Sequence, residues 1–178
     1  ALAHGDIWFG GITRNPWNIA EGASGSSAGS ASATAAGLVG FSIGTETLGS
    51  ITSPSQRCGT TGLRPTFGRV SRSGAMTLCW SLDKIGPICR TVEDTVLVLS
   101  AINGFDSDDK GSIDASFNYD ASSSIEGLRV GYIPASFEDE GSTDVDRDAL
   151  EAMRQLNVEL VEVSLPELPY MSLKNVVN

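Results

Sequence analysis

The stretch GASGSSAGSASATAAGLVGFSIGT, residues 22–45, carries the strongest structural signal in the chain. Its Gly/Ser-rich start has the composition of a solvated linker. From residue 27 to residue 38, however, Ala, Ser and Thr continue for about three helical turns, and Ala is the best helix former. Gly37 stands where a helix C-cap is expected, and residues 39–45 predict a short buried strand. We therefore expect a close-packed helix and then a strand, not a linker.

Predicted helices and strands alternate along the rest of the chain. The patterns favour strands at residues 83–90, 128–133 and 158–166, and helices at 92–103 and 142–156, the first of them capped by Thr91. Turn residues predict loops at residues 1–22, 46–55 and 104–127, with Pro54 as a stop in the second. This alternation predicts an α/β fold.

Composition excludes several classes of protein. The chain has 178 residues and a net charge of −10, which argues against a nucleic-acid-binding face on this segment, since phosphate binding needs clustered Lys and Arg. No apolar run is long enough to span a membrane. The cysteines, Cys58, Cys79 and Cys89, fit no metal-binding spacing, so we expect no metal and free thiols in a reducing, cytoplasmic compartment.

Two catalytic or binding motifs are matched only in part. GSSAG, residues 25–29, fits the nucleophile elbow of α/β-hydrolases around Ser27, but the preceding residues make a poor strand. The only histidine, His4, precedes this serine, whereas that family places its histidine last. Ser27 remains an alternative nucleophile.

Residues 106–117 partly match a calcium-binding loop, with Asp106 and Asp108 in register. Lys110 occupies a ligand position, and Phe117 stands where the bidentate Glu should be. We interpret this segment as a solvated acidic loop.

Ser26 and Ser50 lie in glycine-rich surroundings that suit a serine nucleophile without a histidine. A serine hydroxyl needs a base, and a lysine with a lowered pKa can replace histidine, with a second serine relaying the proton. Neighbouring glycines let backbone N–H groups point at a developing oxyanion. The structural alternative is that both serines merely cap helices and turns.

Several ordered blocks carry a resemblance to a known family. The blocks are RNPWN (14–18), SGSSAGS (24–30), GTETLGS (44–50), RCGTTGLRPTFGRVSR (57–72) and SLDKIGPICRTVED (81–94). In this order and spacing they resemble the amidase signature family, densely over residues 11–104. Within it, the chain is most similar to the A subunits of glutamyl-tRNA(Gln)/aspartyl-tRNA(Asn) amidotransferases and to stand-alone amidases built like them. The resemblance implies a mixed β-sheet flanked by helices, with residues 1–178 as the central part of one amidase domain truncated at both ends.

The resemblance also implies a mechanism. Ser50 falls on the family's nucleophile, and Ser26 falls on a relay serine with a cis peptide bond. The backbone N–H groups of Thr47, Leu48, Gly49 and Ser50 fall on the oxyanion hole. The third member, a lysine, belongs upstream of the serine-rich run, and none of Lys84, Lys110 and Lys174 matches its position. No cofactor is implied.

The substrate implied is a small-molecule carboxylic amide, hydrolysed with release of ammonia or an amine, or with ammonia handed to other amidotransferase subunits. This chain departs from the family pattern at five positions: Ala28 for Gly, Glu46 for Asp, Leu48 for Gly, Thr52 for Arg and Arg64 for Lys. Thr52 weakens the case for a carboxylate-bearing substrate such as glutamine. The alternative function is a catalytically inactive scaffold or binding member of the same fold.

Overall fold

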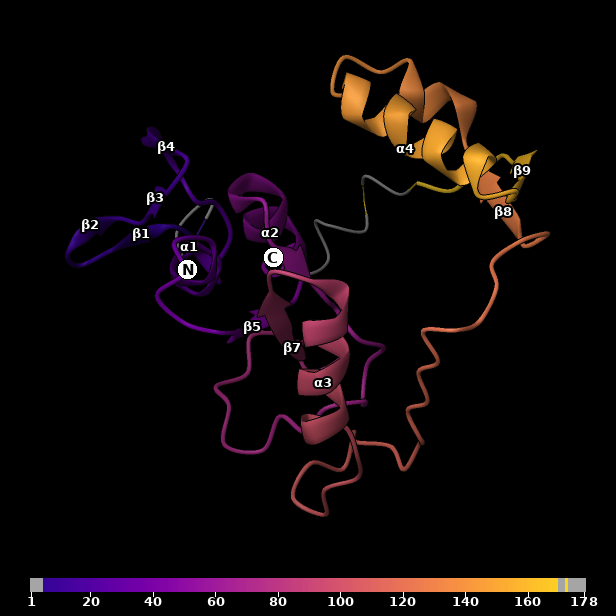
Figure 1. Cartoon of the computed structure of the whole chain (residues 1–178). Coiled ribbons are helices and arrows are strands. Elements are labelled where there is room, and N and C mark those ends of the chain that lie inside the picture. The colour runs from indigo at the N-terminus through magenta and orange to yellow at the C-terminus, as the bar shows by residue number, and fades with distance from the viewer. Residues whose placement is uncertain (1–4, 170–171, 173–178) are drawn as a thin grey trace. The chain divides into compact units, whose positions relative to one another are not determined.

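The structure, a computed structural model, describes residues 5–169 and 172 (Figure 1). His4 and Lys174 lie outside the described residues. The chain divides into two compact units, residues 1–119 and 120–178. All of the candidate site residues lie in the first unit.

Two small hairpins open the first unit, where the sequence predicts only loop. β1 (Ile7–Trp8) pairs antiparallel with β2 (Gly11–Ile12), and β3 (Arg14–Asn15) pairs antiparallel with β4 (Asn18–Gly22). The loop expectation is wrong here because the strands are too short to show a period-2 pattern. The predicted Asn-Pro turn does form: the side chain of Asn15 accepts a hydrogen bond from the N–H of Trp17 (3.0 Å).

The Ala-rich stretch forms α1 (Ala28–Ala35), as predicted. The helix ends at Ala36, and Gly37 takes a left-handed φ of 72°. The N–H of Gly37 donates to Thr34, and that of Leu38 donates to Ala33, which is the Schellman arrangement. Only glycine adopts this backbone conformation without strain, so the sequence ends the helix at a defined point.

A three-stranded antiparallel sheet lies in the first unit, in the order β5-β7-β6, and Figure 1 labels its strands β5 and β7. Its strands are β5 (Ser42–Glu46), β6 (Thr61–Gly62) and β7 (Lys84–Cys89). β5 starts three residues later than expected and is only half-buried, whereas β7 matches its prediction closely. The last pair in the β5–β7 register joins Glu46 to Lys84, and this end of the sheet carries the candidate site.

Two further helices pack around this sheet. α2 (Thr52–Cys58) contacts α1 and β6, and α3 (Val92–Ile102) contacts β7. Thr91 caps α3 as predicted, accepting the N–H of Asp94 (3.1 Å). α2 corrects the expected loop at residues 46–55. Pro54 lies in its first turn, where a helix needs no N–H donor.

Small side chains dominate the core of this unit. Its buried cluster comprises Ala23, Ala28, Ala31, Ile51, Cys58 and Ile88. Small residues let α1 and α2 approach the sheet closely, and glycines in the contact zone have no room for a side chain. A Cβ on Gly44 of β5 would lie 2.9 Å from both the Ile88 and Ser27 side chains. The core therefore holds residues 25–27 tightly against β5 and α2.

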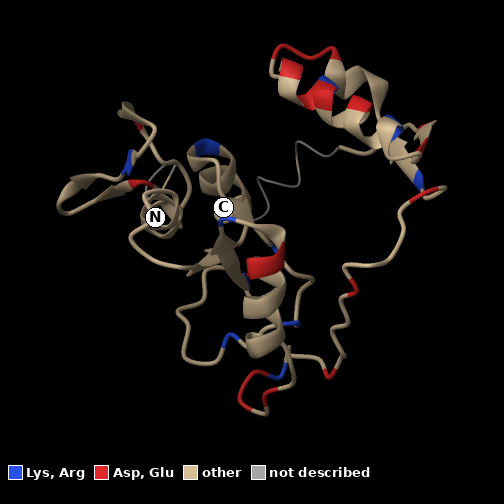
Figure 2. Cartoon of the chain, in the orientation of Figure 1, with Lys and Arg blue, Asp and Glu red and all other residues tan. Residues whose placement is uncertain are grey.

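The second unit confirms its predicted elements. β8 (Arg129–Tyr132) pairs in parallel with β9 (Glu159–Glu162), and α4 (Asp144–Gln155) connects them, preceded by a short 3₁₀ helix, Pro134–Phe137. Figure 2 shows acidic residues gathered on α4. Parallel and antiparallel strand pairs both occur in the chain. In the part that the structure describes, no helix combines the length and apolarity needed to cross a bilayer.

Candidate active site

The fold brings Ser26 and Ser50 together, although 24 residues separate them in sequence. The N–H of Ser27 donates to the carbonyl oxygen of Ser50 (3.2 Å). A Cβ placed on Gly25 would lie 3.4 Å from the Ser50 Cα. Ser27 therefore bonds to Ser50 and Gly25 lies next to it, so the main chain around Ser26 is adjacent to Ser50.

Glycines make this close approach feasible. Gly25 has a φ of 66°, and a Cβ there would lie 2.6 Å from the ring of Pro54. On the other side, a Cβ on Gly5 would lie 2.5 Å from the Ser26 nitrogen. The main chain on either side of Ser26 thus passes close to Gly5 and to Pro54, while Ser26 itself is exposed.

The peptide bonds of the described residues are all trans, which differs from the cis bond implied for Ser26. The trans form is favoured by about 3 kcal/mol before a non-proline residue. The chain turns here through positive φ angles at Ser24 (61°) and Gly25 (66°) instead.

Glu46 organises the turn that leads from β5 to α2 and contains Ser50. Its carboxylate accepts the N–H groups of Ile51 and Thr52 at 2.8 Å each, and the Thr52 hydroxyl at 3.1 Å. The same carboxylate lies 3.7 Å from the guanidinium of Arg64. Glu46 therefore caps α2 through its side chain.

These hydrogen-bond donors lower the pKa of Glu46. Burial raises it, but the backbone N–H groups of Thr52, Ile51 and Gly49 together outweigh burial and leave the pKa below its ordinary value. The Gly49 N–H lies close enough to this carboxylate to lower its pKa, but the hydrogen bonds to it come from Ile51 and Thr52. Among the described residues, the N–H groups of Leu48 and Ser50 have no hydrogen-bond acceptor.

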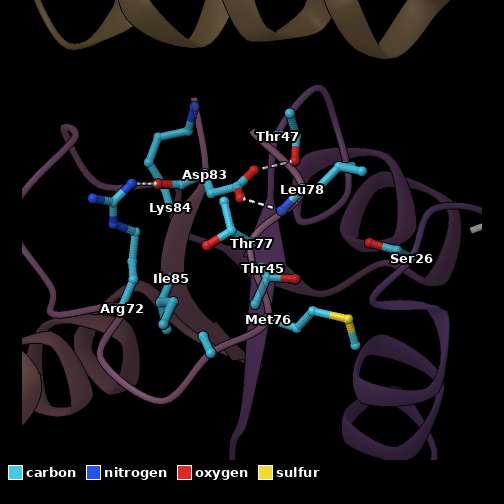
Figure 3. A pocket seen from close by; sticks show the side chains of 11 residues that line it. Ser26, Thr45, Thr47, Arg72, Met76, Thr77, Leu78, Asp83, Lys84 and Ile85 are labelled. Carbon is cyan, nitrogen blue, oxygen red and sulfur yellow. Dashed lines mark hydrogen bonds between the residues drawn. The ribbon is translucent and has the colours of Figure 1, made fainter. Parts of the chain in front are cut away.

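A cavity of about 140 Å³ opens beside Ser26 (Figure 3). Its walls come from the end of β5, the start of β7 and the loop between Arg72 and Asp83: Ser26, Thr45, Thr47, Arg72, Ala75, Met76, Thr77, Leu78, Asp83, Lys84 and Ile85. The Ser26 hydroxyl points toward Thr45 and Met76 in Figure 3. Ser50 is not among the residues that line this cavity.

Lys84 is the one lysine among the described residues in the wall of this cavity. Burial and the positive charge of Arg64 lower its pKa, and Glu46 opposes them. Figure 3 shows its amine and the Ser26 hydroxyl at opposite ends of the cavity. Lys84 is therefore not placed to accept a proton from Ser26, which agrees with its mismatch to the family's lysine.

Arg72 anchors the far wall through a buried ion pair with Asp109. Two guanidinium nitrogens meet the two carboxylate oxygens at 3.0 Å each, and the Arg72 N–H donates to the same group (2.9 Å). These hydrogen bonds hold the pKa of Asp109 far below its usual range. The predicted acidic loop is thus only partly solvated, because its Asp109 is buried against Arg72.

The other carboxylates of this loop serve structural roles. Asp106 accepts the hydroxyl of Ser71 (2.5 Å) and the N–H of Asp108 (2.9 Å). Within the described ranges, no three His, Cys, Asp or Glu side chains converge as metal ligands.

Ser27, the alternative nucleophile, is buried and engaged. Its hydroxyl donates to the carbonyl of Thr45 (3.1 Å) and accepts the N–H of the same residue (3.1 Å). The residues before it form no strand, since β4 ends at Gly22. The geometry of an exposed serine on a strand-to-helix turn is therefore missing.

The sequence reasoning missed the roles of the Asp83 and Thr47 side chains. The Thr47 hydroxyl donates to the Asp83 carboxylate (2.5 Å), joining the turn before Ser50 to the start of β7. Asp83 lies inside the SLDKIGP block, so its position is visible in the sequence. Its partner is not, because 36 residues separate the two.

Comparison with protein families and curated proteins gives a consistent result. A family model described as Amidase matches residues 4–177. The A subunit of glutamyl-tRNA(Gln) amidotransferase from Staphylococcus epidermidis is 44% identical over 165 residues, which cover 89% of this chain and 34% of that protein.

Solved structures show the same architecture. The A subunit of glutamyl-tRNA(Gln) amidotransferase from Thermotoga maritima superposes with a TM-score of 0.81 at 33% identity, covering 86% of this chain and 35% of that one. Peptide amidase from Stenotrophomonas maltophilia gives a TM-score of 0.82 at 36% identity, covering 92% and 35%. The chain thus spans about a third of the length of the relatives it matches.

Proposed function

Because this chain belongs to the amidase family, we propose that it forms part of an enzyme that hydrolyses carboxylic amides with Ser50 as nucleophile. The observation that carries this proposal is the contact of both neighbours of Ser26 with Ser50. A nucleophile and a relay group have to lie within reach of each other, and the main-chain contacts of Ser27 and Gly25 with Ser50 support that arrangement.

The proposed reaction has two steps. The Ser50 oxygen attacks the amide carbon, and its proton passes through the Ser26 hydroxyl to a lysine that the family resemblance places upstream of the serine-rich run. The C–N bond then breaks, the nitrogen takes a proton and leaves as ammonia or an amine, and Ser50 keeps the acyl group. Water, with its proton passed along the same route, releases the carboxylic acid.

Backbone N–H groups of the turn are proposed to stabilise the oxyanion that forms in each step. Those of Leu48 and Ser50 are suited to this, because they have no acceptor among the described residues. The N–H groups of Thr47 and Gly49 belong to the same turn, that of Gly49 near the Glu46 carboxylate. Removing one such donor typically costs a factor of about 100 to 1,000 in kcat.

The substrate class follows from the relatives. They include A subunits of glutamyl-tRNA(Gln) amidotransferases and a peptide amidase. We propose a small-molecule or peptide amide as substrate. The ammonia is either released or transferred to partner amidotransferase subunits. The three cysteines of the described region are free, so we place the protein in the cytoplasm.

Fluorophosphonate labelling followed by peptide mass spectrometry tests the nucleophile. The probe is applied to this chain and to a version extended upstream by the segment that carries the family's lysine, each with a Ser50→Ala control. Because Ser27 is the alternative nucleophile, a Ser27→Ala variant is labelled in parallel.

We expect the label on Ser50 in the extended version alone, since the lysine would be supplied there. Label on Ser50 in both versions would show that another base suffices. Label on Ser27 would support the nucleophile-elbow alternative. A folded extended version without label on Ser50 would favour the inactive scaffold.

A further inference from the structure

Asp83 joins two walls of the cavity beside Ser26 through one carboxylate. One oxygen accepts the hydroxyl of Thr47 (2.5 Å). The other accepts the backbone N–H groups of Leu78 (2.7 Å) and Cys79 (2.8 Å). Figure 3 draws the hydrogen bonds from this carboxylate to the Thr47 hydroxyl and to the Leu78 nitrogen.

The carboxylate is ionised at neutral pH. Burial raises the pKa of Asp83, but hydrogen bonds from Thr47, Cys79 and Leu78 and the charge of Arg72 outweigh it and hold the pKa below its ordinary value. Hydrogen bonds to a charged acceptor are about twice as strong as neutral ones. The three bonds therefore make a firm link between segments that are far apart in sequence.

The loop on the Asp83 side is held by polar contacts with little apolar packing, since besides the Asp83 hydrogen bonds the Arg72 guanidinium donates to the carbonyl of Trp80 (2.7 Å). Residues 73–82 form no helix or strand, and the side chains of Met76 and Leu78 are 97% and 73% exposed. Both side chains nevertheless line the cavity together with Ser26. Apolar packing therefore contributes little to the position of this wall, which depends on the hydrogen bonds of Asp83 to Leu78 and Cys79 and on that of Arg72 to Trp80.

We infer that Asp83 is a positioning residue, which clamps the loop 73–82 and the turn at Thr47 into the relative arrangement that the substrate requires. The inference rests on the proposed function, because Thr47 belongs to the turn that carries Ser50. Through Thr47 the clamp orients the proposed oxyanion donors. Through Leu78 and Cys79 it places Met76 and Leu78 as the apolar wall against which the substrate binds.

Steady-state kinetics can distinguish the contact at Thr47 from the contacts at Leu78 and Cys79. The measurements use the version of the protein that shows Ser50-dependent amidase activity. We expect Thr47→Val to lower kcat about tenfold or more with KM nearly unchanged, because a hydrogen bond to a charged group is lost at the turn. Thr47→Ser should restore kcat, since it keeps the hydroxyl. Asp83→Asn should lower kcat and also raise KM, because the loop loses its charged acceptor.

The double variant measures whether Thr47 and Asp83 act as one unit. In Thr47→Val/Asp83→Asn, kcat should be close to that of Asp83→Asn alone. If the two residues acted independently, the fold-decreases in kcat of the two single variants would multiply. Glu93→Gln, which removes an exposed carboxylate on α3, is the matched control and should leave kcat and KM unchanged. Multiplying effects, or a Thr47→Val enzyme with the kinetics of the parent, would overturn the inference.

Hydrogen exchange distinguishes failure of the clamp from failure of the proposed function. We expect the amides of Leu78 and Cys79 to exchange faster in Asp83→Asn than in Glu93→Gln, with or without amidase activity. If activity does not depend on Ser50, the proposed function fails and this readout alone tests the clamp. Unchanged exchange at both amides would show that Asp83 does not hold the loop.

Discussion

At the residue scale, single carboxylates hold the candidate site together. Glu46 collects donors from the turn before α2, Asp83 collects them from Thr47 and the loop 73–82, and Asp109 neutralises Arg72 in the far wall. Each carboxylate has a lowered pKa because hydrogen bonds to its ionised form outweigh the cost of burial. Charge-assisted hydrogen bonds therefore organise the turn before α2 and the walls of the cavity.

The pH dependence of stability tests this for Glu46. Its pKa lies below the ordinary value of 4.5, so its stabilisation is fully present above that value and is lost as pH falls through the lowered pKa. Glu46→Gln should cost on the order of 2 kcal/mol at pH 7, because hydrogen bonds to a charged group are replaced by neutral ones. Urea unfolding between pH 7 and pH 3, followed by tryptophan fluorescence, measures this.

The difference between the two proteins should shrink as the pH falls below 4.5, because the unfolded chain then binds a proton that the folded protein resists, and the advantage of the ionised Glu46 declines. The exposed Glu93→Gln variant serves as the control for the loss of one charge. A difference that stays constant across this range would show that the charge on Glu46 contributes nothing to the cap.

At the scale of elements, α1 and α2 are short helices of small or weakly helix-forming residues. α1 has eight residues and α2 has seven, and neither would persist alone in water. They persist because Ala28, Ala31 and Cys58 are buried and because Glu46 caps α2. Packing, and not helix propensity, thus sets the position of the two serines.

Two glycine substitutions separate propensity from packing. Gly29 lies in α1 without a positive φ, and a Cβ there would meet nothing within 4 Å, so Gly29→Ala should stabilise the protein by about 1 kcal/mol. Gly44 is enclosed by Ile88, Ser27 and Ile51, so Gly44→Ala should destabilise by about 1–3 kcal/mol. Urea unfolding of both variants measures the two free energies.

Opposite signs for these two substitutions are the expected result. Destabilisation by Gly29→Ala as well would mean that the outer face of α1 is covered by another part of the protein.

At the scale of the whole molecule, the chain consists of two compact units, residues 1–119 and 120–178. The family match at residues 4–177 runs across both, so we propose that they are parts of one amidase domain. The proposed catalytic residues belong to the first unit alone.

A capping variant tests whether the units unfold separately. The Thr143 hydroxyl donates to the Asp146 carboxylate at the start of α4 (2.8 Å), and Thr143→Ala should destabilise the second unit by about 1 kcal/mol. All three tryptophans lie in the first unit, so their fluorescence transition should not move, while the circular dichroism transition should. Equal shifts of both transitions would show one cooperative unit.

The sequence by itself determined the elements whose signals are local. α1 with its Gly37 ending, β7, α3 with its Thr91 cap, β8, α4 and β9 lie close to where the patterns predict them. The small hairpins and α2 were missed because pairing and burial, not propensity, stabilise them. Ser26 and Ser50 were identifiable as candidates from their glycine-rich surroundings, and their catalytic roles stay predictions.

Only the tertiary structure decided which of these residues meet. It placed Ser26 against Ser50, joined Thr47 to Asp83 and paired Arg72 with Asp109 across 37 residues. It also tied the hydroxyl of Ser27 to β5 and turned the amine of Lys84 away from Ser26. Propensities, caps and turns act between near neighbours, so a sequence displays them directly, whereas contacts between distant residues exist only after close packing has brought the segments together.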